Sequence, residues 1–271
     1  MSFEQINERG LVLLGCGKMG SAMLAGWLSG GLSASSVWVK DPFPSDWVKA
    51  QGVHLNEELP SSPSIVLVAV KPQMMTDALP VLAAMGNKDT LFVSVAAGVT
   101  ISSYESILGD QTPIIRAMPN TPAAIGRGIT AIVGNAHASG PMLDLADALL
   151  SAIGQVVRLE GEHQMSAVTA ISGCGPAYVF HLIEAMAAAG VGAGLAPDLA
   201  MQLAKATVGG AGALAEEAAE DPATLRQNVT SPNGVTYEAL QVLMNDTDGF
   251  PPLLVRAVEA AVKRDQELSN G

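Results

Sequence analysis

The sequence predicts an α/β fold: an N-terminal, largely parallel β-sheet with helices on both faces, followed by an all-helical C-terminal domain. Short apolar runs alternate with helical stretches over the first 160 residues, whereas no convincing strand follows residue 162. Hydrophobic residues make up 49% of the 271 residues and charged residues 15%, which is enough apolar material for one or two sizeable cores. We therefore expect two domains, 1–160 and 161–271.

Seven apolar runs in the first domain are predicted to be strands. They are rich in Val, Ile and Leu and mostly continuous, which is typical of strands with both sheet faces covered. Helical stretches between several of them imply right-handed crossovers and a largely parallel sheet. The strands are expected at 11–15, 36–40, 65–70, 90–95, 113–118, 128–133 and 155–159, and the helices at about 18–31, 44–51, 73–85, 100–108 and 140–153.

The second domain is predicted to be a bundle of five or six helices, because Ala, Leu, Met and Glu dominate residues 162–268. Its density of Ala and Gly indicates tight helix–helix contact, a subunit boundary being one place for it. The stretch 174–196 is long enough to span a membrane, but His181 and Glu184 near its middle favour a buried helix of a soluble protein. Helix breaks are expected at 173–176, 190–197, 221–222, 231–234 and 249–252.

The charge balance argues against two classes of partner. Lys and Arg total 14 and Asp and Glu total 26, so the net charge is −12. Such a surface repels nucleic acid and anionic lipid, and we expect neither nucleic acid nor membrane as a partner.

Cys16 and Cys174 form no disulfide or zinc pattern, which fits a reducing compartment. The polar first ten residues and the short run 11–14 do not resemble a signal peptide, so a cytoplasmic location is expected.

The segment Gly15–Gly20 (GCGKMG) has the G-x-G-x-x-G spacing of a dinucleotide-binding loop. It follows an apolar strand and opens a helix, which is the context that this fingerprint requires. Gly15 permits the tight turn, Gly17 lets the backbone approach a pyrophosphate, and Gly20 allows close helix–strand packing. Free N–H groups and the helix dipole then attract phosphates. The motif predicts a Rossmann-type domain, the alternative being a glycine-rich turn without a ligand.

The residues at the ends of the next two strands do not decide between NAD and NADP. Asp41 could bind the ribose 2′-hydroxyl of NAD, while the adjacent Lys40 could bind the 2′-phosphate of NADP, and the spacing does not say which side chain faces the ribose. The third strand ends in Ala69–Gln73, where Lys71 is either close to the cofactor or an ordinary surface lysine.

Four further motifs occur together with the glycine loop: AVKPQ at 69–73, MPNTP at 118–122, SGCGPAY at 172–178 and VTSPNGVT at 229–236. In this order and spacing they resemble pyrroline-5-carboxylate reductases, and the resemblance runs from about residue 11 to residue 268. Two positions depart from the family pattern: Cys174 stands where Ser or another small residue is common, and Asn233-Gly234 stands where Gly-Gly is common. Asn tolerates the left-handed backbone that Gly allows.

The resemblance implies reduction of L-1-pyrroline-5-carboxylate to L-proline, the last step of proline biosynthesis, with NADPH or NADH as hydride donor and no metal. It also implies a homodimer at least, assembled further as a decamer of five dimers, with the helical domain serving dimerisation and substrate binding. The cofactor contacts it implies are Leu14, Gly15, Cys16, Gly17, Lys18, Met19, Gly20, Asn56, Ala69, Val70, Lys71, Pro72, Ala97 and Asn228. The substrate contacts it implies are Glu162, Ser231, Gly234, Val235 and Thr236, with Thr236 as the catalytic residue.

The chemistry of this reaction makes few demands on side chains. A cyclic imine is already an electrophile, so the hydride must be placed close to the carbon, and no strong base, metal or nucleophile is required. The four histidines form no triad or metal-spaced cluster. Backbone N–H groups at the helix start after Ser231 can bind the substrate carboxylate, and Thr236 can hydrogen-bond the ring nitrogen. An ordinary capped helix N-terminus is the alternative.

Two other functions remain open on the sequence. A β-hydroxyacid dehydrogenase-like reductase would share the two-domain plan, but it depends on a lysine of the interdomain helix, and residues 159–204 contain neither Lys nor Arg. A non-catalytic dinucleotide-binding sensor would have no need of the segments at 118–122 and 230–236.

Overall fold

The computed structural model describes residues 4–269, which divide into two compact units. The first unit contains the described residues up to Gly173 and those from Ala261 onward, and the second is Cys174–Ala260. Residues 161–173 pack with the first unit because Met165 belongs to its core. The domain boundary at residue 160 stays a prediction.

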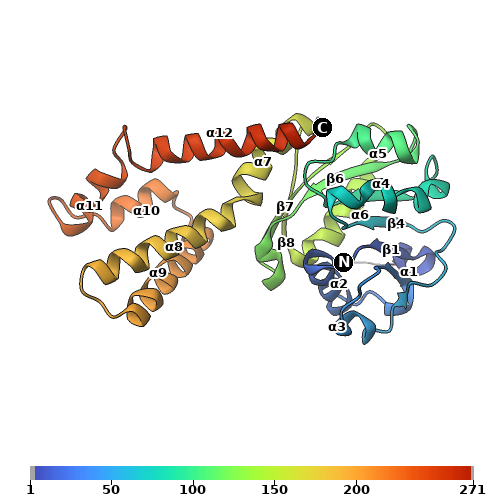
Figure 1. The fold of residues 1–271 in the computed structure, drawn as a ribbon, viewed down its shortest axis with the longest axis horizontal. Coiled ribbons are helices and arrows are strands. Elements are labelled where there is room, and N and C mark those ends of the chain that lie inside the picture. Colours follow the sequence, from blue (N-terminus) through green and yellow to red (C-terminus); the bar gives the residue numbers. More distant parts are fainter. Residues whose placement is uncertain (1–3, 270–271) are drawn as a thin grey trace. The chain divides into compact units, whose positions relative to one another are not determined.

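An eight-stranded sheet lies at the centre of the first unit (Figure 1) in the order β3-β2-β1-β4-β5-β6-β7-β8. All neighbouring strands run parallel except β6 and β7, which confirms the predicted largely parallel sheet. The strand order reverses between β1 and β4, which is the topological switch point where such sheets bind ligands. The strands are β1 Leu11–Leu14, β2 Val37–Lys40, β3 His54–Leu55, β4 Ile65–Val68, β5 Leu91–Ser94, β6 Ile114–Met118, β7 Gly128–Gly134 and β8 Gly154–Arg158.

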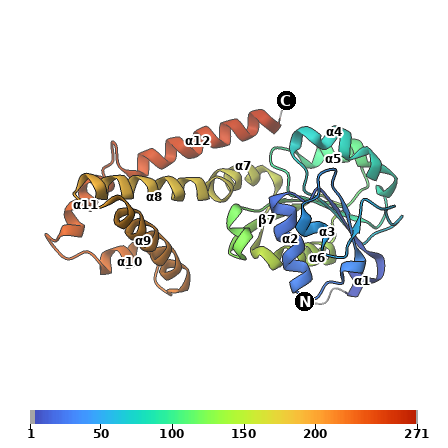
Figure 2. The same ribbon diagram turned by 60° about the horizontal axis from the view of Figure 1, so that its bottom comes forward.

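Helices lie on both faces of this sheet (Figure 2). Each face has its own hydrophobic core, since successive strand residues point to opposite faces. Leu13 belongs to the core that contains Trp27 of α2, and its neighbour Val12 to the core that contains Tyr104 of α5. The helices of this region are α1 Glu4–Arg9, α2 Lys18–Ser29, α3 Asp46–Lys49, α4 Met75–Ala78, α5 Ile101–Leu108 and α6 Gly140–Leu150.

One predicted helix, 73–85, is broken into shorter pieces. A 3₁₀ turn at Pro72–Met74 precedes α4, and a second one at Pro80–Met85 follows it. Pro80 has no N–H to continue an α-helix and clashes with the preceding turn, so the helix stops there.

The second unit is helical, and no strand follows β8 in the described residues, as predicted. One predicted break differs: a π-helical turn at Thr169–Gly173 joins α7 almost directly to α8, so Glu162–Gly192 is a nearly continuous helix. Pro176 lies in the first turn of α8, where its missing N–H costs nothing. The helices are α7 Met165–Val168, α8 Gly175–Gly192, α9 Pro197–Glu217, α10 Pro222–Asn228, α11 Val235–Leu243 and α12 Phe250–Ser269, of which α7 and the last turns of α12 belong to the first unit.

The apolar stretch 174–196 is not buried within the single chain, contrary to the prediction. Phe180 of α8 is 59% exposed, and the buried hydrophobic side chains of the second unit are all alanines, namely Ala187, Ala200 and Ala204. By length and composition alone, Glu162–Gly192 is the one described helix that could cross a membrane, with a mean hydropathy of 1.3.

Candidate functional site

The carboxyl edge of the sheet gathers the cofactor residues predicted for the first unit. The final residue of β1 is in register with the final residues of β2 and β4, and β5 ends beside β4. Because these strands are parallel, the segments that follow them leave the sheet at one edge. Those segments are the glycine loop Gly15–Gly20, Asp41, Ala69–Pro72 and Ala97.

The glycine loop has the backbone that the fingerprint predicts. Gly15 has φ +86°, and a Cβ there would lie 2.9 Å from the Ala69 carbonyl oxygen. A Cβ on Gly20 would lie 2.6 Å from the Gly15 carbonyl oxygen, so the start of α2 packs directly on the loop. A Cβ on Gly17 would meet nothing within 4 Å. The loop is therefore closed against the protein at Gly15 and Gly20 and open to a ligand at Gly17.

The amino end of α2 is available for an anion. The helix begins at Lys18 with Gly17 as its N-cap, and no side chain of the described residues caps it. The first N–H groups of a helix have no intrahelical acceptor, and they attract negative charge together with the helix dipole. Open space at Gly17 and uncapped amides at the start of α2 fit the pyrophosphate of a dinucleotide.

Asp41 is fixed against the glycine loop by its carboxylate. Its Oδ2 accepts a hydrogen bond from the Cys16 N–H at 2.6 Å, and its Oδ1 accepts one from the Phe43 N–H at 2.7 Å. Asn56 holds the backbone of Asp41 from the other side, accepting from its N–H at 3.0 Å and donating to its carbonyl oxygen at 2.8 Å. Asn56, a predicted cofactor contact, thus positions Asp41, and it does so with a left-handed backbone of φ +57°.

Cys16 lies inside the loop but is unsuited to nucleophilic chemistry. The side chain is buried, and burial raises the pKa of the Cys16 thiol above its ordinary value. Because the thiolate is the reactive form, this thiol is less reactive than an exposed one.

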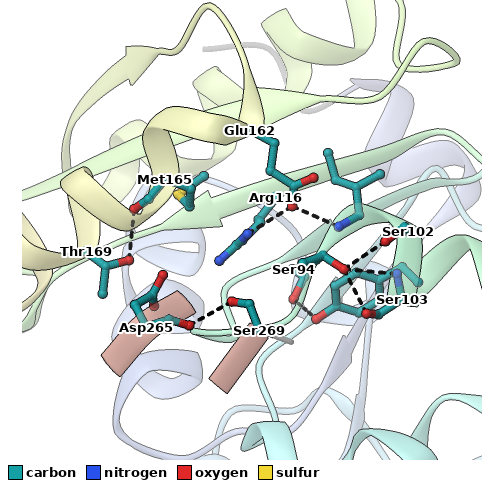
Figure 3. A network of polar contacts seen from close by, with 12 residues as sticks. Ser94, Ser102, Ser103, Arg116, Glu162, Met165, Thr169, Asp265 and Ser269 are labelled. Carbon is teal, nitrogen blue, oxygen red and sulfur yellow. Dashed lines mark hydrogen bonds and ion pairs between the residues drawn. The ribbon is translucent and has the colours of Figure 1, made fainter. Parts of the chain in front are cut away.

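A buried ion pair lies close to the same sheet edge (Figure 3). Arg116 of β6 is 4% exposed, and its Nη1 donates to Glu162 Oε1 at 2.9 Å. The same oxygen accepts from the Ile101 N–H at 2.9 Å, at the amino end of α5. Glu162, a predicted substrate contact, therefore compensates the charge of Arg116 and complements the dipole of α5.

Arg116 was not predicted from the sequence, although a single charge within the apolar run 113–118 is a signal for a buried ion pair. In the described residues, Arg116 Nη2 and Asp265 Oδ2 are the buried side-chain polar atoms without a hydrogen-bond partner. Asp265 lies in the last turns of α12, within the first unit, and Ser269 donates to its carbonyl oxygen at 2.9 Å.

The second unit contributes a helix start with an unusual sequence. Gly234 is the N-cap of α11, and no described side chain caps this helix. A Cβ on Gly234 would lie 2.2 Å from Ser231 Oγ and 3.0 Å from the Ser231 carbonyl oxygen, so a larger residue would require the Ser231 side chain to move. Asn233 has φ +56°, a left-handed conformation that Asn tolerates as Gly does. The Ser231 side chain does not cap α11, so the first amides of this helix have no side-chain partner in the described residues and could bind a carboxylate.

The remaining predicted substrate residues lie at this helix start. Val235 is 91% exposed and Thr236 is also exposed in the single chain. Asn228, a predicted cofactor contact, is the last residue of α10.

The histidines show no catalytic cluster, and residues 4–269 contain no group of three or more His, Cys, Asp or Glu side chains placed to hold a metal. His54 has a structural environment: its ring stacks on Trp38 at 4.4 Å between centroids, and it hydrogen-bonds Glu57 and the Ser35 carbonyl oxygen.

Two protein families match the chain. The family described as pyrroline-5-carboxylate reductase dimerisation matches residues 162–268, and the family described as NADP oxidoreductase coenzyme F420-dependent matches residues 10–98. The first match covers the helical region and the second covers the glycine loop with strands β1 to β5.

Full-length relatives agree with both matches. A pyrroline-5-carboxylate reductase of Pseudomonas aeruginosa is 37% identical over 265 residues, covering 96% of each chain. The solved structure of a pyrroline-5-carboxylate reductase from Coxiella burnetii has a TM-score of 0.90 at 32% identity and covers 96% of this chain and 98% of its own. The Plasmodium falciparum pyrroline carboxylate reductase, solved with NADP bound, has a TM-score of 0.82 at 26% identity and covers 97% and 99%.

Proposed function

The chain belongs to the pyrroline-5-carboxylate reductase family, and from this premise we propose how its residues serve the reaction. The enzyme is an NAD(P)H-dependent oxidoreductase that reduces the C=N bond of L-1-pyrroline-5-carboxylate to give L-proline. The observation that carries this function is 37% identity to a reductase of that name along 96% of both chains.

The first unit binds the dinucleotide in this proposal. Gly17 leaves room for the pyrophosphate, and the uncapped amides of α2 donate to its oxygens. When bound, the reduced nicotinamide supplies the hydride. The other proposed contacts at the sheet edge are Leu14, Ala69–Pro72 and Ala97, with Asn56 acting through Asp41. Asn228, the last residue of α10, is a further proposed cofactor contact.

The start of α11 binds the substrate carboxylate. Its free amides and the Ser231 hydroxyl can donate to the two carboxylate oxygens, which provides a site for an anion in a chain of net charge −12. The Thr236 hydroxyl hydrogen-bonds the ring nitrogen and so orients the imine. Glu162 keeps its proposed substrate role through Oε2, since Oε1 already accepts from Ile101 and Arg116.

We also propose that the enzyme works in the cytoplasm as a homodimer that assembles further into a decamer of five dimers. The dimerisation family match over 162–268 supports self-association, and so does the exposed apolar surface of the second unit.

The test is a spectroscopic assay with full-length protein, L-1-pyrroline-5-carboxylate and either NADH or NADPH. We expect the absorbance of the reduced nicotinamide to fall as proline accumulates in equal amount. Folded protein that binds the dinucleotide but oxidises neither donor would favour the sensor function. Oxidation supported only by a 3-oxo acid would favour the hydroxyacid dehydrogenase.

A further inference from the structure

We propose that Asp41 makes this chain prefer NADH to NADPH. The inference rests on the proposed function, because it concerns the donor that binds at the glycine loop. It concerns one carboxylate at the end of β2, about 20 residues after that loop, where an acidic side chain can accept from the ribose hydroxyls of a dinucleotide.

The position of the Asp41 carboxylate is fixed by short contacts. Both of its oxygens accept from backbone N–H groups, one of them from Cys16 within the glycine loop. Hydrogen bonds of N–H groups to a carboxylate at 2.6 and 2.7 Å are at the strong end of their range. The two bonds from Asn56 to its backbone prevent the end of β2 from moving away. The negative charge therefore stays beside the phosphate loop.

The neighbouring cation bonds to a backbone oxygen and forms no ion pair with Asp41. Lys40 Nζ donates to the Asn56 carbonyl oxygen at 3.0 Å, and its side chain lines a hollow with Leu59 and Lys88. Lys40 follows Trp38 at a spacing of two, so both point to the sheet face opposite that of Val39. Among residues 4–269, no Lys or Arg forms an ion pair with Asp41. Of Lys40 and Asp41, the two candidates for the ribose contact, only Asp41 is hydrogen-bonded to the glycine loop through its side chain.

These contacts have opposite consequences for the two donors. A ribose 2′-hydroxyl can donate to a carboxylate, whereas the 2′-phosphate of NADPH brings negative charge to a carboxylate that no Lys or Arg of residues 4–269 neutralises in an ion pair. The Plasmodium falciparum relative was solved with NADP bound, and it shares 26% of its sequence with this chain. One side chain at this position can reverse the sign of the local charge and with it the choice of donor.

The experiment measures binding separately from turnover. Full-length protein is titrated with NADH and with NADPH, and the dissociation constants are obtained from the nicotinamide fluorescence. A competition with adenosine 5′-monophosphate and adenosine 2′,5′-bisphosphate isolates the contribution of the 2′-phosphate. We expect NADH to bind at least tenfold more tightly than NADPH, and catalytic efficiencies in the assay to follow the same order.

Three variants assign the effect to its residue. Asp41→Asn removes the charge and keeps an oxygen for the Cys16 N–H, and Asp41→Ser is the second choice if that variant fails to fold. Both are expected to bind NADPH at least tenfold better than the native chain. Asp46→Asn is the matched control, since it removes one carboxylate from the exposed helix α3 and should leave the ratio unchanged. Circular dichroism and the melting temperature establish that each variant is folded.

The outcomes separate this inference from the function on which it rests. Native preference for NADPH, or an unchanged ratio in both Asp41 variants, overturns the inference while turnover with either donor leaves the function intact. Loss of NADPH binding on Lys40→Gln would assign the donor choice to that lysine instead. If neither donor binds to folded native protein, the dinucleotide site is absent and both proposals fail.

Discussion

Gly17 and Gly20 lie in the same loop, but a side chain has different consequences at the two positions. A Cβ on Gly17 meets only open space, so Gly17→Val should fold normally while filling the volume proposed for the pyrophosphate. A Cβ on Gly20 lies 2.6 Å from a backbone oxygen that cannot move freely, so Gly20→Ala should destabilise the chain by about 1–3 kcal/mol.

Thermal unfolding and a fluorescence titration with NADH distinguish these effects. Gly17→Val is expected to keep its melting temperature and to bind NADH at least tenfold more weakly, about 1.4 kcal/mol. Gly20→Ala is expected to melt earlier. Normal affinity in Gly17→Val would remove the pyrophosphate from this loop.

Thr236 is the residue to which we assign orientation of the imine. Thr236→Ala removes one hydroxyl from an exposed position, so the fold should be unaffected. Losing one hydrogen bond to the reacting ring should lower kcat/KM by roughly tenfold, while NADH binding stays within error. Thr236→Ser restores the hydroxyl and should recover most of the rate. Equal kinetics for Ala and native protein would exclude Thr236 from the reaction.

The buried hydroxyl of Tyr104 on α5 contacts strand β5. Its titration should make the free energy of unfolding depend on pH. The Tyr104 hydroxyl contacts Ser94 Oγ, and burial raises the pKa of Tyr104 from 10.0 to about 12. The folded state then keeps its proton where the unfolded state has lost it, so stability is fully present below pH 10 and decreases between pH 10 and pH 12. The full loss is about 2–3 kcal/mol.

The check is the free energy of unfolding by denaturant at several pH values from 9 to 12, for native protein and for Tyr104→Phe. The variant lacks the titrating group, so its stability should fall less steeply over this range even though its stability at pH 9 is lower. Parallel slopes for the two proteins would show that Tyr104 does not titrate in this way.

Helices and strands could be predicted from the sequence where the pattern of apolar residues alone determines them. All seven predicted strands are present, and β1, β4 and β5 are buried along their whole length, as their continuous apolar runs predict. Strand β3 was missed since His54–Leu55 has no such run and is formed only through its pairing with β2. The predicted helix 73–85 is interrupted because Pro80 cannot continue an α-helix.

The parts of the candidate site that depend on local backbone conformation could be predicted from the sequence. Gly15 was predicted to permit a tight turn and has φ +86°, while Asn233 has the left-handed backbone that Asn tolerates. The partners of Glu162 and Asp41 were not predictable, since they come from segments far apart in the chain: Arg116 for the first and the Cys16 amide for the second. Contacts between residues so far apart in sequence can be identified only once the arrangement of the strands is known.

At the scale of the whole molecule, the second unit has too little core to stand alone. Only small side chains are buried among the described residues of Cys174–Ala260, whereas large apolar residues such as Phe180, Leu203 and Leu214 are about half exposed. A monomer rarely leaves so many large apolar side chains in water, and obligate dimers bury such side chains against a second copy. The dimerisation family match over 162–268 gives the same conclusion from homology.

Introducing one charged side chain on this surface should therefore disrupt the proposed self-association. Phe180 is 59% exposed on α8, and Phe180→Glu should lower the molar mass measured by light scattering at micromolar concentration, together with the helical signal and the melting temperature. Val81, 61% exposed in the first unit, provides the matched control, and Val81→Glu should keep the native molar mass. If Phe180→Glu kept the native mass, α8 would lie outside the interface. A native mass of two chains rather than ten would limit the assembly to the dimer, because a ring of five dimers requires contacts beyond those within each pair.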